Sequence, residues 1–151
     1  AGDAIGTHRI SVTREGGELH VAIDIELAVS FGPITVFRYE HRNRETWQDG
    51  KLIALETETN DDGKRYTVSA TATDEGLEVT SSANGTFMAP AGIIPTSYWN
   101  PATLTQTQLL DTQKGRIIDV DIEETGAREA RADGRIIPVR EYRMTLPLIH
   151  S

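Results

Sequence analysis

The sequence predicts an all-β domain, a strongly curved antiparallel meander sheet that forms an open or partial β-barrel. Ile, Thr and Val number 14, 18 and 8 of the 151 residues, and their β-branched side chains fit a pleated, half-buried surface best. Pairs that tolerate positive φ, such as Gly16-Gly17, Asp62-Gly63 and Asn84-Gly85, recur along the chain, as tight hairpin turns require. The strand-like runs between these turns should therefore pair with their neighbours in order.

Composition and charge narrow the class of protein. With 38% hydrophobic and 25% charged residues, the chain suits one globular domain over residues 1–151. No apolar run approaches the roughly 18 residues of a membrane span. A net charge of -8 disfavours nucleic acid and anionic membranes as partners, because both need clustered cations. The absence of cysteine excludes disulfides, zinc-thiolate sites and thiol nucleophiles.

The first residues predict an exported protein. The chain begins Ala1-Gly2-Asp3-Ala4, without Met and without an apolar leader. This is what a signal peptidase leaves when it cuts behind small residues. We therefore expect a periplasmic or secreted protein.

The clearest strand is Leu19–Phe31, in which every second residue is apolar. At about 3.3 Å per residue the strand is roughly 40 Å long, too long to stay flat in a domain of this size. We expect it to coil so that its apolar side lines a concave, buried face. The seven side chains of that side are Leu19, Val21, Ile23, Ile25, Leu27, Val29 and Phe31.

The next strand, Ile34–Trp47, begins with Val36 and Phe37 side by side, which breaks the alternation. One extra residue at this point would set Leu27 opposite Tyr39 and Ile25 opposite His41, on the concave face. Because a slip of one residue exchanges the two faces of a strand, we predict a β-bulge near Val36–Phe37.

Five later strands are predicted at Leu52–Thr59, Arg65–Thr73, Leu77–Ala83, Arg116–Glu124 and Ile137–Leu146. The turn at Asp49-Gly50 leaves two registers open. A two-residue turn would bury Glu56 and Glu58, whereas a three-residue turn would bury Ile53 and Leu55. The second is favoured because buried unpaired carboxylates are costly.

The stretch Ala89–Gly115 departs from the strand pattern, with three of the six prolines and the pair Tyr98-Trp99. Asn100-Pro101 is typical of an N-cap followed by the first helical residue, and predicts a short helix through about Gln106. We expect this stretch to pack over one mouth of the sheet, with Tyr98 and Trp99 as a lid or as a hydrophobic plug.

Candidate ligand-binding residues come from the strand Ile34–Trp47 and from the stretch Ala89–Gly115. His41, Asn43 and Glu45 are polar residues on an otherwise apolar face and could orient a ligand in a cavity; alternatively they lie near the rim or bond to the loop above it. The full candidate set is Tyr39, His41, Asn43, Glu45, Trp47, Tyr98, Trp99 and Asn100.

Catalytic and metal motifs are not found. Asp119, Asp121 and Glu123 share an outer strand face, which favours solvated carboxylates over a calcium site, and no histidine has metal-ligand spacing. Neither a nucleophile elbow nor a phosphate loop occurs. We expect no cofactor, no metal and no enzymatic activity; an enzyme with His41 or Glu45 as general base is a remote alternative.

Three segments resemble an uncharacterised family of exported bacterial β-rich proteins that carry a domain of unknown function. They are Pro95–Pro101 (PTSYWNP), Leu109–Gln113 (LLDTQ) and Tyr39–Trp47. The resemblance implies a periplasmic or secreted β-rich domain, and it brings no catalytic residues. Members of that family continue beyond the equivalent of Leu146 with about one more hairpin, so this chain would lack those strands and leave an open sheet edge that invites a second copy.

The function predicted from the sequence is a non-enzymatic module that binds an apolar or lipid-like small molecule on the concave face of the sheet. The alternative is a structural or protein-interaction domain of the cell envelope with a filled core. A homodimer through an open sheet edge is a further expectation.

Overall fold

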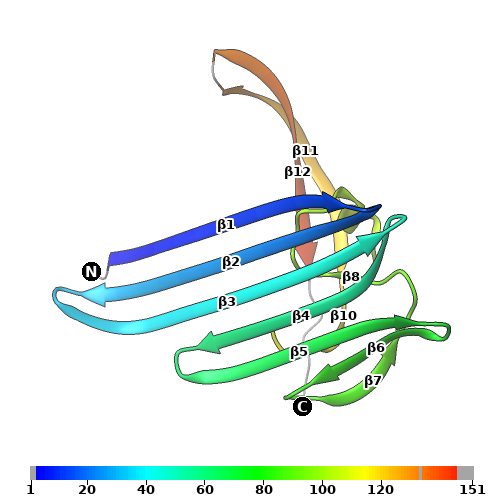
Figure 1. The fold of residues 1–151 in the computed structure, drawn as a ribbon. Coiled ribbons are helices and arrows are strands. Elements are labelled where there is room, and N and C mark those ends of the chain that lie inside the picture. The colour runs from blue at the N-terminus through cyan, green and yellow to red at the C-terminus, as the bar shows by residue number, and fades with distance from the viewer. Residues whose placement is uncertain (1–2, 133, 146–151) are drawn as a thin grey trace.

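The computed structural model of the protein describes residues 3–132 and 134–145. Its main feature is a seven-stranded antiparallel sheet whose strands pair in sequence order (Figure 1), which confirms the predicted all-β meander. The strands are β1 (Asp3–Glu15), β2 (Glu18–Phe31), β3 (Ile34–Gln48), β4 (Lys51–Asp61), β5 (Lys64–Thr73), β6 (Gly76–Ser81) and β7 (Gly85–Ala89).

The β-bulge in β3 is confirmed at the predicted position. Val29 pairs with Phe37 and Ser30 with Thr35, so Val36 is the extra residue. As a result Leu27 lies opposite Tyr39 and Ile25 opposite His41. Directly opposed residues of two antiparallel strands share one face, so the bulge places His41 on the concave side.

The turn at Asp49-Gly50 differs from the favoured three-residue turn. It has two residues, because Gln48 pairs with Lys51. Ile53 is then an extra residue in β4, a second bulge, because Trp47 pairs with Leu52 and Thr46 with Ala54. Leu52 and Leu55 are therefore buried, while Glu56 and Glu58 are exposed. The carboxylates stay outside as predicted, but a bulge and not the turn brings this about.

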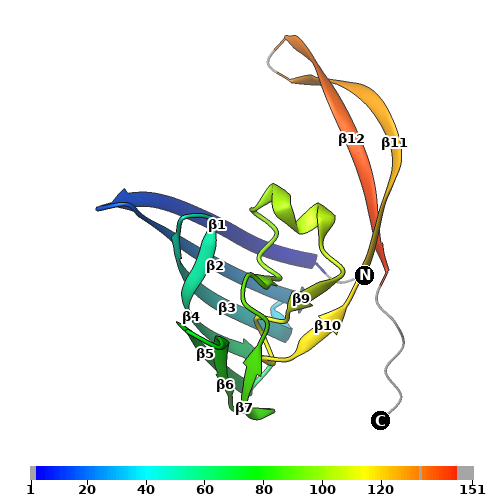
Figure 2. The same ribbon diagram turned by 90° about the vertical axis from the view of Figure 1, so that its right-hand side faces the viewer.

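The sheet does not close into a barrel; an open or partial barrel was predicted, and the structure shows an open, curved sheet. Within the described residues β1 and β7 are the two edges of the sheet and do not pair with each other. Instead, the sheet curves, and residues 90–119 lie across its concave face (Figure 2). We call this segment the cover.

The concave face of β2 is only partly buried, contrary to expectation. Val21 and Ile23 are buried, but Leu27 is 36% and Phe31 52% exposed. Strand β4 ends at Asp61 opposite Tyr39, so the turn end of the β2–β3 hairpin projects past β4 to β7, with only β1 beside it (Figure 1). The long strand bends with the sheet, but the apolar side chains of Leu27 and Phe31, toward its end, remain exposed.

The cover contains a three-stranded sheet and a single turn of helix. Strand β8 (Ile94–Pro95) pairs in parallel with β9 (Gln108–Leu110), which pairs antiparallel with β10 (Ile117–Asp119). The predicted helix is a 3₁₀ turn, η1 (Pro101–Thr105), and Asn100 caps it as predicted, because its side chain accepts a hydrogen bond from the Ala102 N–H.

The core lies between the cover and the middle of the main sheet. Leu109 and Leu110 of the cover are fully buried against apolar side chains of β2 to β6. The buried cluster comprises Val21, Ile23, Trp47, Leu52, Leu55, Val68, Ala70, Leu77, Val79, Ala89, Ile93, Ile94, Leu109, Leu110 and Val120.

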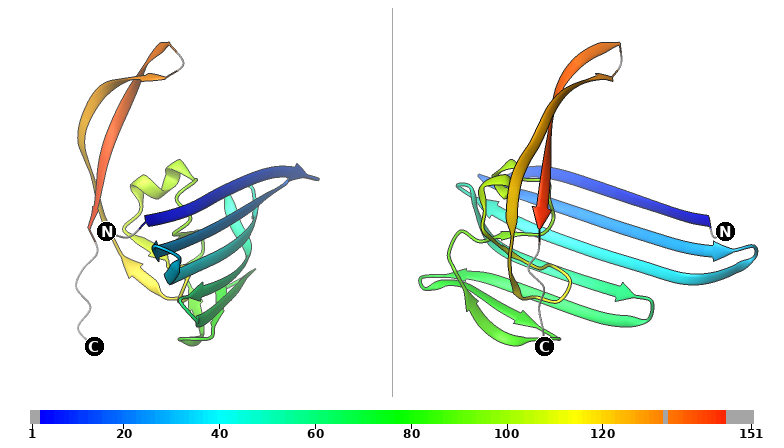
Figure 3. Two further views of the ribbon diagram at one scale, coloured as in Figure 1. Left: turned by 90° about the vertical axis from the view of Figure 1, so that its left-hand side faces the viewer. Right: turned by 180° about the vertical axis from the view of Figure 1, so that it is seen from behind.

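A separate hairpin, β11 (Asp121–Ala132) and β12 (Arg135–Thr145), follows the cover and extends away from the main sheet (Figure 3). The predicted strand Arg116–Glu124 is therefore two strands in different sheets, separated at Val120, whose N–H donates to Thr107 O. Leu146, the predicted end of the last strand, and the expected departure beyond it lie outside the described residues. No helix in the described part of the chain has the length and apolar character needed to cross a membrane.

Candidate ligand-binding cavity

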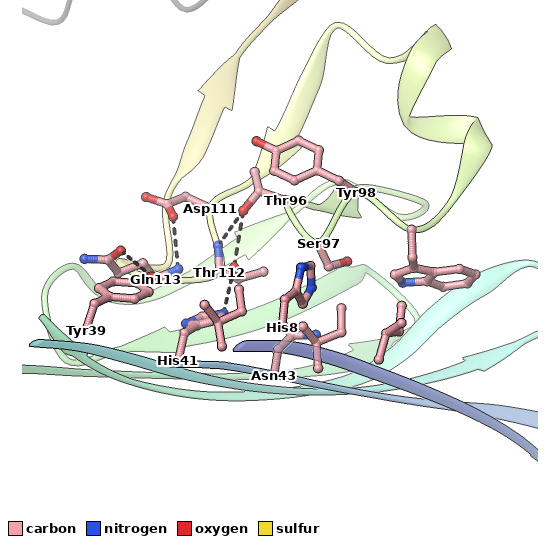
Figure 4. A pocket seen from close by; sticks show the side chains of 14 residues that line it. His8, Tyr39, His41, Asn43, Thr96, Ser97, Tyr98, Asp111, Thr112 and Gln113 are labelled. Atoms are coloured by element: carbon pink, nitrogen blue, oxygen red, sulfur yellow. Dashed lines mark hydrogen bonds between the residues drawn. The ribbon is translucent and has the colours of Figure 1, made fainter. Parts of the chain in front are cut away.

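A cavity of about 500 Å³ lies between the concave face and the cover (Figure 4). This volume is within the range of roughly 300–1,000 Å³ that is usual for small-molecule sites. Its floor is formed by strands β1, β2 and β3, and its roof by two stretches of the cover. The lining residues are His8, Ile10, Ile23, Ile25, Tyr39, His41 and Asn43 from the floor, and Thr96, Ser97, Tyr98, Trp99, Asp111, Thr112 and Gln113 from the roof.

The floor is positioned by strand register. Ile10 lies opposite Ile23 on β2, which lies opposite Asn43 on β3, so these three side chains form one row across the concave face. The next row contains His8, Ile25 and His41. Each row joins apolar side chains of β1 or β2 to a polar side chain of β3.

The Glu45 carboxylate, only 2% exposed, connects floor and roof without lining the cavity. Its Oε1 accepts hydrogen bonds from the indole N–H groups of Trp47 and Trp99, both at 2.8 Å. Its Oε2 accepts one from Asn43 Nδ2 at 2.7 Å. Charge-assisted bonds of this kind are about twice as strong as neutral ones, so Glu45 holds Trp99, and with it the roof, against β3.

The two indole rings meet edge to face, with centroids 5.3 Å apart and planes at 89°. Trp99 therefore combines the two roles considered for it: it plugs the core through Trp47 and contributes one wall of the cavity. Trp47 and Asn100 do not line the cavity; the first belongs to the core and the second caps η1.

His41 is buried and bonded on both sides of its ring. Its Nδ1 lies 2.7 Å from Thr59 Oγ1, and its Nε2 lies 3.4 Å from Thr112 Oγ1. Desolvation by burial lowers the pKa of His41 below 6.5, although the carboxylate of Asp111 opposes the shift. At neutral pH the imidazole is therefore uncharged.

Hydrogen bonds from the sheet hold the second stretch of the roof. Thr57 Oγ1 donates to Thr112 O at 2.6 Å, and the Thr112 N–H donates to Thr96 Oγ1 at 3.1 Å. At the open end of the cavity, Tyr39 Oη donates to Gln113 Oε1 at 3.2 Å. These bonds fix the height of the roof above the floor.

Asp111 supplies the carboxylate of the lining. Its Oδ2 accepts a hydrogen bond from Arg116 Nε at 3.3 Å, and its Oδ1 accepts one from the Gln113 N–H. Desolvation by burial is the main cause that raises the pKa of Tyr39 and of Tyr98. The charge of Asp111 adds to both shifts, and at Tyr39 it comes after the charge of Asp61.

Tyr98 is the exposed member of the aromatic pair and does not act as a buried plug. It is 57% exposed, and its φ of 60° is in the left-handed region that residues other than glycine rarely adopt. Strained backbone of this kind clusters at functional sites. The Tyr98 side chain lies in the roof, away from the floor of the cavity (Figure 4).

Of the 14 lining residues, five belong to the predicted candidate set, two more (Ile23 and Ile25) were predicted on the concave face, and the other seven were not predicted. The five from the candidate set are Tyr39, His41, Asn43, Tyr98 and Trp99. Asp111, Thr112 and Gln113 belong to a segment that carried the family resemblance, which was their available signal. His8 and Ile10 had no signal of their own, because β1 lacks clear alternation.

Metal-binding groups do not gather in the described residues, where no cluster of three or more His, Cys, Asp or Glu side chains occurs. Asp119, Asp121 and Glu123 are exposed, as predicted for a solvated face. Asp119 accepts a hydrogen bond from Gln108, and Glu123 pairs with Arg143.

Comparison with known protein families gives one match, to the family described as Domain of unknown function (DUF6134), over residues 1–150. The chain belongs to this family. Membership agrees with the resemblance to an uncharacterised family, and it assigns no activity to the DUF6134 domain. No curated protein and no solved structure shows significant similarity to the chain.

Proposed function

We propose that this DUF6134 domain is a non-enzymatic module that binds an apolar or lipid-like small molecule in the cavity beneath the cover. The observation that carries the proposal is the lining itself. Ile10, Ile23 and Ile25 form an apolar floor, and three aromatic side chains and a few polar groups surround it. Pockets that bind small molecules combine these two features.

A second argument is that the three segments that carried the family resemblance meet at this cavity. Tyr39–Trp47 provides part of the floor, and Pro95–Pro101 and Leu109–Gln113 provide the roof. These segments are far apart in the sequence. Core packing joins them through Leu109, Leu110 and the Trp47–Trp99 contact, and the same three segments also line the cavity.

The proposal is tested by titration with the uncharged apolar fluorophore N-phenyl-1-naphthylamine. Ile10→Trp places a large ring in the cavity, so we expect it to weaken binding by at least about 10-fold, since overfilling a site excludes its ligand. The matched control is Ile5→Trp, the same change on the opposite face of β1, where Ile5 is 75% exposed.

Saturable binding that Ile10→Trp removes and Ile5→Trp leaves supports the proposal. Absence of saturable binding to the wild-type protein, or equal effects of the two substitutions, would overturn it. Native mass spectrometry of the mildly purified protein provides a second readout, a bound species of defined mass.

A protein-interaction domain is the second candidate, and exposed apolar side chains favour it. Phe31, Ile34 and Val36 lie exposed at the projecting end of the β2–β3 hairpin, next to the open edge of β1. An unpaired edge strand is a template for another chain, including a second copy of this one. In that case, cross-linking should recover a partner or a dimer, and Ile34→Ser, at a side chain that is 64% exposed, should weaken capture more than stability.

Catalysis is not part of the proposal. Glu45 is occupied by three N–H donors and lies outside the cavity lining. His41 faces a threonine hydroxyl at Nδ1, and a hydroxyl does not stabilise an imidazolium as a carboxylate does. We also propose a periplasmic or secreted location, which rests on the family resemblance and which fractionation of producing cells tests.

A further inference from the structure

The free end of the β2–β3 hairpin gathers apolar side chains that contact water. We call residues 27–37 the hairpin tip. Of the 13 large hydrophobic side chains that are exposed in the part of the chain described here, five lie in the hairpin tip or beside it on β1. A cluster of this kind on a protein surface marks a site of interaction. The five side chains are Ile5, Leu27, Phe31, Ile34 and Val36.

The hairpin tip has no charged side chain, because residues 27–37 contain no Asp, Glu, Lys, Arg or His. Its turn includes Pro33, which has no backbone N–H that would lose a partner away from water. The tip can therefore enter an apolar medium without the desolvation of a charge within it. The charged residues at its border are Glu26, Arg38, Asp62, which bonds to the Arg38 backbone, and Asp3, which lies opposite Ser30.

Apolar side chains lie on both sides of this end of the sheet. Phe31 continues the concave row of β2, and Ile34 is paired with it and shares that side. Ile5 lies on the convex side, opposite Ala28. A protein that docks on one face of the sheet would leave the other face in water, whereas a bilayer surrounds a projecting end (Figure 1) and buries both.

An apolar strip connects the hairpin tip with the cavity. On the concave side of β2, Leu27, Val29 and Phe31 continue the row of Ile23 and Ile25, which line the cavity. Successive side chains of such a row are about 7 Å apart. A hydrocarbon chain that leaves a bilayer at the tip would therefore meet apolar side chains all the way to the cavity. Only this argument rests on the proposed function.

We propose that the hairpin tip docks on the surface of a phospholipid bilayer, with Phe31 and Ile34 inserted between the lipids. Binding of this kind grows with the apolar area that is buried. The net charge of -8 favours zwitterionic lipid, because an anionic surface repels the rest of the domain. The protein partner named above as the second candidate is the competing occupant of the same side chains.

The first test is co-sedimentation with large unilamellar vesicles of phosphatidylcholine. The wild-type protein should bind them, and Ile34→Ser should weaken binding by at least about 5-fold, since burial of an isoleucine side chain contributes at least this factor. The matched control is Ile136→Ser on the separate β11–β12 hairpin, where the side chain is 61% exposed against 64% for Ile34. This control should bind as the wild type does, and phosphatidylglycerol in the vesicles should not strengthen binding.

The second test shows whether the tip itself enters the bilayer. The chain has no cysteine, so Ile34→Cys provides a single site for the environment-sensitive fluorophore NBD. On addition of phosphatidylcholine vesicles its emission should move to shorter wavelength, and nitroxide-labelled lipid should quench it. The same label at Ile136→Cys should show neither change.

The outcomes separate the membrane from a protein partner and from the cavity. No binding of the wild-type protein to vesicles, tighter binding to phosphatidylglycerol, or equal effects at Ile34 and Ile136 overturns the proposal. If vesicles do not bind and Ile34→Ser instead abolishes a cross-linked partner or dimer, the tip belongs to a protein interface. Ile34 does not line the cavity, so Ile34→Ser should leave the titration with N-phenyl-1-naphthylamine unchanged, and each proposal can fail without the other.

Discussion

Glu45 places a carboxylate inside the covered part of the sheet, where three N–H donors from β3 and the cover meet it. Glu45→Gln keeps the shape but replaces one oxygen by a donor that faces these donors. We expect a loss of about 2–3 kcal/mol in the free energy of unfolding, the usual worth of a hydrogen bond to a charged group. Urea denaturation measures it.

The control for this prediction is Glu56→Gln, on the exposed face of β4. It should change the free energy of unfolding by less than about 0.5 kcal/mol. Equal effects of the two substitutions would mean that the Glu45 cluster does not hold the cover to the sheet.

His41 makes stability depend on pH. Burial lowers its pKa below 6.5 in the folded protein, so the unfolded chain takes up the proton first as the pH falls. The contribution of His41 is therefore complete above about pH 6.5 and is lost progressively below it. His41→Gln should flatten the fall of the unfolding free energy between pH 7 and pH 5.5.

The imidazole itself can be titrated by NMR. The folded protein should show a His41 pKa below 6.5, with the ring neutral at pH 7. A value at or above 6.5 would show that the charge of Asp111 outweighs desolvation, and the ring would then be a partial cation in the cavity lining.

Residue patterns in the sequence were enough to find Asn43 and Glu45 as polar groups on an apolar face. They could not show that one lines the cavity while the other lies behind it. That distinction depends on the indole N–H of Trp99, which is 54 residues away in the chain. Alternation reports which face a side chain occupies, and not what covers it.

At the scale of elements, Gly115 is a point of close approach between the cover and the main sheet. Its φ is 65°, and a Cβ at this position would lie 2.6 Å from Ser81 Cβ and 3.0 Å from Val68 Cγ2. Ser81 Oγ in turn donates to Lys114 O. Gly115→Ala should therefore lift the end of the cover from β5 and β6.

Gly92→Ala is the matched control, because Gly92 also has a positive φ of 84° but has nothing within 4 Å of the added carbon. Gly92→Ala should lower the free energy of unfolding by about 1–2 kcal/mol, which is the cost of placing a residue other than glycine at positive φ. Gly115→Ala should cost at least about 2 kcal/mol more, measured by urea denaturation. Equal costs would show that the cover is not packed tightly there.

The sequence predicted a structural element correctly where a short local pattern was compatible with one structure only. Val36 beside Phe37 broke the alternation and revealed the bulge in β3. Asn100-Pro101 revealed the start of η1. The second bulge, at Ile53, gave no comparable break, because Leu52, Ile53, Ala54 and Leu55 are all apolar. Either side of this run could face the core, so the sequence did not determine how β4 is aligned with β3.

For the molecule as a whole, the fold class was predictable and the arrangement of the cover was not. Turn residues and β-branched content determine a meander, whose pairings are local. The cover depends on the parallel pairing of β8 with β9 and on contacts between distant segments, for which the sequence carries no periodic signal. The cover buries Val21 and Ile23 of β2 and leaves Leu27 and Phe31 exposed. The cavity lies between these two parts of the strand, at Ile23 and Ile25.

The most direct measurement of the central claim is an NMR titration of the isoleucine methyl groups with N-phenyl-1-naphthylamine. We predict that the methyl signals of Ile10, Ile23 and Ile25, together with the indole N–H of Trp99, shift and saturate at one ligand per chain. The signals of Ile5, Ile34 and Ile136, which are exposed elsewhere, should not move. Saturation at those three residues instead, or the absence of saturable shifts anywhere, would contradict a binding cavity beneath the cover.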